Sequence, residues 1–202
     1  MNICVYGASS SVIAGVYIKP VEILGTKLAD RGHTLIFGGG KHGLMGAAAR
    51  GVKTGGGKII GVVPEFLASG GVIYEECDEV IYTETMRERK AVMESKADAF
   101  VITPGGPGTL DEFFEILTLK QLGRHSKPIA VLNTCGYYDD LIKQLRSSVL
   151  KHFISPDNLK LFAVFDSQDK LIDYLEANPT ADFVTEELRY TCLLYTSPSP
   201  RD

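Results

Sequence analysis

The chain has 202 residues, of which 45% are hydrophobic and 23% are charged, and its formal net charge at pH 7 is −4. This length is typical of one domain with a sizeable core, and the composition argues against a disordered chain. No basic run and no apolar stretch of about 18 residues occurs, so we expect neither a nucleic-acid partner nor a membrane partner.

Short apolar runs alternate with helical patterns along the chain. The runs predict strands at residues 3–6, 34–37, 59–63, 80–82, 99–102, 128–132 and 161–165. The patterns between them predict helices at residues 20–30, 43–49, 86–97, 110–122, 138–152 and 168–177, the first with Pro20 in its opening turn. Because the strands are continuously apolar, they predict an α/β fold in which helices cover both faces of a parallel sheet.

Both ends of the chain bear on its organisation. A strand-like run starts at Asn2, which leaves no room for a signal peptide, and the cysteines lack C-x-x-C spacing, so we expect reduced thiols in a cytoplasmic protein. Residues 191–202 have no periodicity and end in a Ser/Pro tract that resembles read-through sequence more than a native element. We therefore expect a single domain over residues 1–180 and a tail over residues 181–202.

Glycine-rich turns follow three of the predicted strands, at residues 7–11, 38–40 and 104–108. In an open parallel sheet these turns lie beyond the carboxyl ends of the strands, which is where ligands bind. Residues 65–78 are less regular, and we interpret them as a flap. The sequence therefore predicts a ligand site at this edge of the sheet.

The turn at residues 103–109 carries the clearest site signal. Its glycines Gly105, Gly106 and Gly108 precede a helix whose first N–H groups and positive dipole end favour an anion such as phosphate. Glu112 lies one turn into that helix, so a carboxylate stands beside the anion site. A structural explanation is equally open, because Thr109 and Glu112 have the S/T-x-x-E spacing of a capping box.

The predicted helix over residues 86–97 places two cations on its most apolar stripe, which consists of Met86, Arg89, Lys90, Met93 and Ala97. Such cations either pack their stems and extend their charged ends into water, or point into a site and bind an anion. We favour the second explanation, which makes the neighbouring carboxylate a catalytic candidate.

Several common site motifs are absent. Residues 38–43 lack the Gly-Lys-Ser/Thr of a Walker A loop, and residues 7–10 lack the G-x-G-x-x-G of a dinucleotide site. The histidines at positions 33, 42, 125 and 152 show no ligand spacing, and no G-x-S-x-G elbow occurs. We therefore expect no metal and no cofactor.

Two long motifs resemble the LOG family, whose members are cytokinin riboside 5′-monophosphate phosphoribohydrolases that are often mislabelled lysine decarboxylases. The family pattern M-x-x-R-K stands at residues 86–90, and P-G-G-x-G-T-x-x-E stands at residues 104–112. Similarity extends to residues 38–46, 61–64 and 121–128 and covers about residues 1–180.

The resemblance implies a Rossmann-like, doubly wound parallel sheet in a homodimeric hydrolase that acts on N-glycosyl bonds. The substrate would be an N6-modified adenosine monophosphate, and the products a free cytokinin base and ribose 5-phosphate. By position, Arg89 and Glu112 match the catalytic pair of the family. The phosphate, ribose and other substrate contacts match Ser9, Lys90, Gly105, Gly106, Gly108, Thr109, Asp111 and Thr118.

The chain departs from the family pattern at Ala8, near Gly71, at Thr85 and at Pro107, which affects base selectivity more than the reaction. Two alternatives therefore stay open: a broader purine or pyrimidine nucleoside-monophosphate glycosidase, and a non-catalytic nucleotide-binding or carrier protein. An unpaired acid beside a phosphate argues against the carrier. A pyridoxal-phosphate decarboxylase is disfavoured, because no lysine stands in an evident Schiff-base setting.

Overall fold

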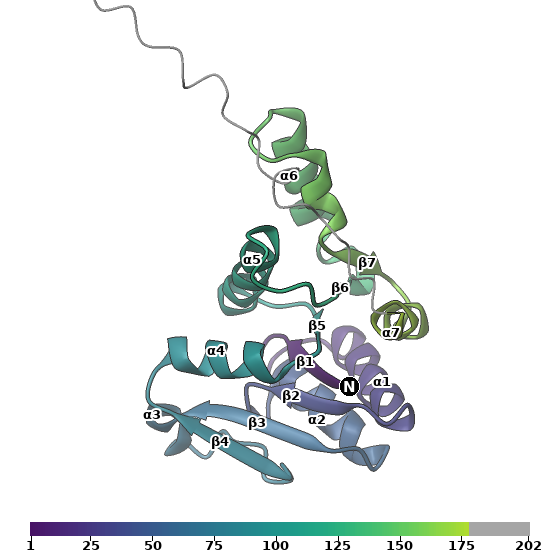
Figure 1. The fold of residues 1–202 in the computed structure, drawn as a ribbon. Helices are drawn as coiled ribbons and strands as arrows, with labels where there is room; N and C mark the ends of the chain where they lie inside the picture. Colours follow the sequence, from purple (N-terminus) through teal and green to yellow (C-terminus); the bar gives the residue numbers. More distant parts are fainter. Residues whose placement is uncertain (178–202) are drawn as a thin grey trace, which may run out of the picture.

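Seven parallel strands form one sheet in the order β4-β3-β2-β1-β5-β6-β7 (Figure 1). The computed structural model describes residues 1–177. The strands are β1 (Asn2–Tyr6), β2 (Thr34–Phe37), β3 (Ile59–Pro64), β4 (Glu79–Thr83), β5 (Ala99–Ile102), β6 (Ile129–Leu132) and β7 (Ala163–Phe165). The strand order reverses between β1 and β5, so the predicted doubly wound, Rossmann-like sheet is confirmed.

Helices cover both faces of the sheet (Figure 1). One layer contains α1 (Gly15–Asp30), α2 (Gly43–Thr54) and α7 (Gln168–Glu176). The other contains α4 (Met86–Lys96), α5 (Pro107–Gln121) and α6 (Asp139–Leu150), and short helices lie at α3 (Glu65–Ala68), η1 (Thr134–Gly136) and η2 (Pro156–Lys160). Within the described part of the chain, no helix is long and apolar enough to cross a membrane. The predicted tail boundary lies outside the described residues.

The core is divided between the two faces by the alternation of side chains along each strand. In β1, Ile3 and Val5 pack in the cluster beneath α1, α2 and α7, whereas Cys4 and Tyr6 pack beneath α4, α5 and α6. The central strands β1 and β5 are buried almost completely. The period of two places neighbouring residues on opposite faces, which is why these strands read as unbroken apolar runs.

The predicted helix boundaries were most in error at the end of α2, which continues to Thr54 instead of ending at residue 49, and at the start of α1. The helix begins at Gly15, so Pro20 lies inside it instead of in its first turn. Proline removes one backbone hydrogen bond and disfavours the helix interior. Tyr17 and Ile18 pack against the core ahead of this proline, which offsets that cost.

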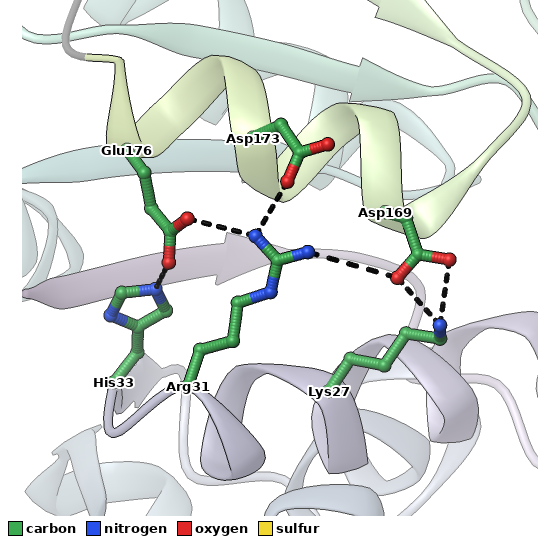
Figure 2. A network of polar contacts seen from close by, with 6 residues as sticks. All are labelled: Lys27, Arg31, His33, Asp169, Asp173 and Glu176. Atoms are coloured by element: carbon green, nitrogen blue, oxygen red, sulfur yellow. Dashed lines mark hydrogen bonds and ion pairs between the residues drawn. The ribbon is translucent and has the colours of Figure 1, made fainter.

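A network of polar contacts joins α7 to α1 and to the turn that follows it (Figure 2). Lys27 donates to Asp169 at 2.6 Å, and Arg31 contacts Asp173 at 2.6 Å and Glu176 at 2.8 Å. The buried His33 completes the network through its Nε2, which lies 2.9 Å from Glu176. Exposed pairs contribute little singly, so the stabilising effect of this contact depends on the network.

Lowering the pH is expected to destabilise the fold partly through His33. Burial holds the pKa of His33 below its ordinary 6.5, so the unfolded chain takes up this proton first as the pH falls below 6.5. Stability is then lost as the pH falls towards the folded-state value. Urea unfolding at about pH 7.5 and about pH 5.5 measures this loss, and His33→Gln should reduce it. An equal loss in the variant would contradict the assignment.

Candidate active site

A cavity of about 610 Å³ opens at the carboxyl ends of the strands, at the point where the strand order reverses. Its walls come from the turns after β1 and β2, from the segment after β3, and from the first turns of α4 and α5. This volume lies within the range of about 300–1,000 Å³ that small-molecule sites occupy. The predicted edge of the sheet is therefore where the structure forms its cavity.

Arg89 and Glu112 form an ion pair in the wall of this cavity. The Arg89 Nη1 donates to Glu112 Oε1 at 2.9 Å, and its Nε donates to the Val62 carbonyl at 3.1 Å. The two side chains are only 7% and 11% exposed. The guanidinium of Arg89 does not extend into water, so the explanation in which its charged end is solvated is wrong.

Two local features position the Arg89 side chain: the cap of α4 and a glycine after β2. Thr85 caps α4 by accepting the N–H of Glu88 at 3.1 Å, and the Glu88 carboxylate accepts the N–H of Glu84 at 2.8 Å. Gly38 permits the close approach from the other side, because a Cβ built there would lie 1.8 Å from Arg89 Nη2. The glycine turn after β2 therefore leaves room for the guanidinium.

Gly38→Ala is expected to displace the Arg89 guanidinium and lower kcat about 10-fold, the effect of weakening one hydrogen bond to a charged group. Gly15→Ala is the matched control, since a Cβ there meets nothing within 4 Å and Gly15 does not line the cavity. Steady-state kinetics and thermal unfolding of both variants measure the effect. Unchanged kcat in a folded Gly38→Ala protein would contradict this role for the glycine.

Burial controls the protonation of Glu112. Desolvation raises the pKa of this carboxyl above its ordinary 4.5, and the nearby Arg89 charge acts in the opposite direction. The negative charge of Asp111 also raises the pKa of Glu112, by a smaller amount. A buried acid with a raised pKa in a cavity wall is a candidate for proton transfer or for stabilising a cation.

The start of α5 borders the same cavity. Gly106 is the N-cap, so the helix begins at Pro107, and Thr109 is its third residue. The predicted capping box of Thr109 with Glu112 is therefore wrong, because Thr109 does not occupy the cap. Thr109 instead packs against Gly105, where a Cβ would lie 2.1 Å from its Oγ1. Glu112 is thus not used for capping.

The N-termini of α2 and α5 both face the cavity, but they differ in their free donors. In α2, the N–H groups of Leu44 and Met45 donate to the Ala8 carbonyl at 2.8 and 3.3 Å. In α5, no acceptor within the described residues takes the N–H groups of Gly106 and Gly108, and Pro107 has none to offer. The N-terminus of α5 is therefore the better place for an anion.

Lys90 lies in the cavity wall but is paired with acids. Its Nζ lies 2.7 Å from Glu115 and 2.9 Å from Asp111, and these carboxylates raise the pKa of Lys90, with Glu115 contributing most. The side chain joins α4 to α5 and holds Asp111 at the rim. Lys90 is thus not a free cation for a phosphate.

Most of the predicted site residues meet in the cavity. Ser9, Arg89, Lys90, Gly106, Gly108, Thr109, Asp111 and Glu112 line it. Gly105 belongs to the same turn but is buried and does not line the cavity. Thr118 is exposed two turns further along α5 and also lies outside the cavity lining. Within residues 1–177, no group of three His, Cys, Asp or Glu side chains is arranged to hold a metal ion.

The sequence-based prediction missed the other end of the cavity. Lys41 and His42 line it after β2, and Leu67, Val72 and Met86 add exposed apolar side chains. The glycine turn at residues 38–40 could have indicated this end of the cavity from the sequence. The flap gave none, since its position depends on a bridge between Gly40 and Ile73 that joins segments far apart in the chain.

Comparisons with known proteins agree with this geometry. The family model described as possible lysine decarboxylase matches residues 45–175. A probable cytokinin riboside 5′-monophosphate phosphoribohydrolase of Oryza sativa is 41% identical over 87% of this chain and 77% of its own length. The corresponding Arabidopsis thaliana enzyme is 38% identical over 93% of this chain and 87% of its own length.

Among solved structures, the molybdenum cofactor carrier protein of Chlamydomonas reinhardtii aligns with a TM-score of 0.66 and 25% identity, covering 88% of this chain and 96% of the carrier. The molybdenum cofactor binding protein of Rippkaea orientalis has the same score at 22% identity, covering 87% and 94% of the two chains, and shows the fold alone. The sequence matches are closer, and the family model covers the cavity residues from Met45 onward. This chain therefore belongs to the LOG family, the group of the cytokinin riboside 5′-monophosphate phosphoribohydrolases.

Proposed function

We propose that this chain is a phosphoribohydrolase that cleaves the N-glycosidic bond of a cytokinin riboside 5′-monophosphate. The observation that carries the proposal is the buried Arg89–Glu112 ion pair beside the free N–H groups of α5. A cavity that offers both unpaired N–H donors and a carboxylate supports this reaction. Relatives at 38–41% identity that bear this activity in their names support the same substrate.

In the proposed complex, the 5′-phosphate lies on the N–H groups at the start of α5, near Gly106 and Gly108. Ser9 and the exposed carboxylate of Asp111 lie at the rim, where they suit the ribose hydroxyl groups. Lys90 orients Asp111 instead of binding the phosphate. Thr109 supports the turn by packing on Gly105.

The reaction replaces the bond between C1′ and the base nitrogen with a bond between C1′ and a water oxygen. The transition state carries positive charge near C1′, as in other glycoside hydrolysis. The Glu112 carboxylate stabilises this charge or takes the proton of the attacking water, and that proton balances the one gained by the departing base. Arg89 holds Glu112 in position and favours its charged form.

The apolar side chains at the rim favour an N6-substituted base over plain AMP. Leu67, Val72 and Met86 line the cavity while remaining 44%, 39% and 42% exposed. Covering exposed apolar surface is favourable, so an apolar N6 group contributes affinity there that an unsubstituted amino group lacks. The broader glycosidase has no corresponding support in the structure.

Chromatography of free base tests the proposal after incubation with isopentenyl-AMP, AMP, GMP, CMP and the isopentenyl riboside. Release from isopentenyl-AMP alone is the expected result. Equal release from all four nucleotides would indicate the broader hydrolase, and binding without release would indicate a carrier. Equal release from the riboside would contradict the phosphate site.

The base-release assay decides between a hydrolase and a carrier, whereas the presence of Glu112 does not. Glu112 is paired with Arg89, so the sequence-based argument from an unpaired carboxylate does not hold. A buried ion pair also occurs as a purely structural feature. Turnover is the property that a carrier lacks.

We also propose that the enzyme is a cytoplasmic homodimer. The helix α6 has no buried residue, and Leu150 and Phe153 near its end are 79% and 78% exposed, which suits contact with a second copy. Free Cys4, Cys77 and Cys135 fit a reducing compartment. Light scattering that gives a monomer mass would contradict the dimer.

A further inference from the structure

The turn between β6 and α6 donates hydrogen bonds to the glycine turn at residues 103–109. The Tyr137 hydroxyl donates to the Gly105 carbonyl at 2.8 Å, and the Tyr138 hydroxyl donates to the Thr103 carbonyl at 2.8 Å. Between them, the Pro104 carbonyl accepts the N–H of Ala8 at 3.2 Å. Three consecutive carbonyls, those of Thr103, Pro104 and Gly105, therefore each accept a hydrogen bond from outside the turn.

The geometry of the peptide bond links this support to the cavity. In a trans peptide, the carbonyl of one residue and the N–H of the next point in opposite directions. Because the Gly105 carbonyl points at Tyr137, the N–H of Gly106 points the other way. Gly106 lines the cavity and its N–H has no acceptor among the described residues, so this donor is available to a ligand.

The supporting turn is itself rigid. The Asn133 side chain accepts the N–H of Tyr138 and donates to Asp139, both at 2.7 Å. Cys135 has a φ of 53°, in the left-handed region that residues with a side chain rarely adopt. Such local strain persists where the surroundings hold it, and it concentrates at functional sites. The strained turn at Cys135 thus precedes Tyr137 and Tyr138, and both of these contact the turn at residues 103–105.

The two tyrosines differ in their surroundings. Tyr138 is buried, and burial raises its pKa, so its hydroxyl remains a donor at neutral pH. Tyr137 is 46% exposed, and its ring packs edge-on against Tyr17 of α1 with centroids 5.9 Å apart. Gly105 is itself buried, so removal of the Tyr137 hydroxyl leaves its carbonyl without this donor, and some loss of thermal stability is expected beside the loss of phosphate binding.

We propose that Tyr137 and Tyr138 are positioning residues that orient the Gly106 N–H toward the 5′-phosphate of the substrate. The inference rests on the proposed function for its substrate, a nucleoside monophosphate. Neither tyrosine touches the reacting atoms. Both act through the backbone of the turn, so their effect falls on phosphate binding.

Tyr137→Phe tests this inference. Phosphate contacts that are equal in the bound substrate and in the transition state change KM and not kcat. The loss of one oriented hydrogen bond is expected to raise KM for isopentenyl-AMP by about 3- to 10-fold with kcat unchanged. Calorimetry with ribose 5-phosphate should show the same loss of affinity, whereas binding of free adenine should not change.

Tyr17→Phe is the matched control, since it removes a hydroxyl from the same aromatic cluster without touching the turn. Tyr138→Phe should weaken ribose 5-phosphate binding as well, together with some loss of thermal stability, because the Thr103 carbonyl is buried. Unchanged ribose 5-phosphate affinity in a folded Tyr137→Phe protein would overturn the inference, as would an equal loss in Tyr17→Phe.

The same measurements separate the inference from the proposed function. If the native protein binds ribose 5-phosphate and Tyr137→Phe weakens that binding, the positioning role is supported even where no base is released. In that case only the hydrolase assignment is refuted. If the native protein does not bind ribose 5-phosphate, the positioning role is refuted.

Discussion

Glu112→Gln is expected to lower kcat for nucleotide hydrolysis at least about 100-fold, the low end of the effect of a positioned acid or base. The amide keeps the shape and the oxygen that accepts from Arg89, but it carries no charge and takes no proton. The fold is expected to form with reduced stability, since the amide still accepts from Arg89 but no longer balances its buried charge. Rates of base release together with circular dichroism measure both effects.

Asp111→Asn is the matched control, because this neighbouring carboxylate is 64% exposed and lies at the rim. Its removal should affect KM more than kcat. Near-normal turnover in Glu112→Gln would refute the catalytic role of this residue, and the ion pair would then be structural.

The pH profile of the native enzyme gives a second measure of the same residue. The proposed mechanism uses the charged form of Glu112, so kcat/KM should fall as the pH drops through its pKa. Burial raises that pKa above 4.5, so the acid limb should lie above the range of an ordinary glutamate. Glu112→Gln should lose this limb. An acid limb that persists in the variant would assign it to another group.

Arg89→Ala is expected to reduce kcat at least about 100-fold and also to destabilise the fold. Removing one partner of a buried ion pair leaves the other charge uncompensated, which costs about 3–5 kcal/mol. The Val62 carbonyl also loses its donor. The loss of stability follows from the burial of Arg89, which is 7% exposed. Urea unfolding measures the stability, and base release measures the rate.

The double variant Arg89→Ala with Glu112→Gln separates stability from catalysis. The second change removes the uncompensated charge, so the double variant should be more stable than Arg89→Ala while remaining inactive. Arg89→Lys keeps a charge but not the planar pair of donors, and it should fold well with low activity. Recovery of activity in the double variant would contradict the assigned roles.

Elements with strong local signals were predictable from the chain. The apolar strands, the helix that begins at Met86 and the glycine turns at the strand ends all lie where the sequence places them. Helix starts were less predictable, as Pro20 and Thr109 show, because packing of Tyr17 on the core and of Thr109 on Gly105 decides them. Local propensity does not include such contacts.

The sequence by itself determined the parallel α/β sheet, the site at the carboxyl ends of its strands and the pairing of Arg89 with Glu112 as candidates. Apolar periodicity, glycine turns and two long motifs are local features of the chain, so they can be read there. The tertiary structure alone decided that these two side chains form a buried ion pair, that Lys90 is neutralised by acids, and that Tyr137 supports the turn. Each of these depends on contacts between segments 20 or more residues apart, at Arg89–Glu112, Lys90–Asp111 and Tyr137–Gly105. Such contacts exist only once the sheet has brought those segments together.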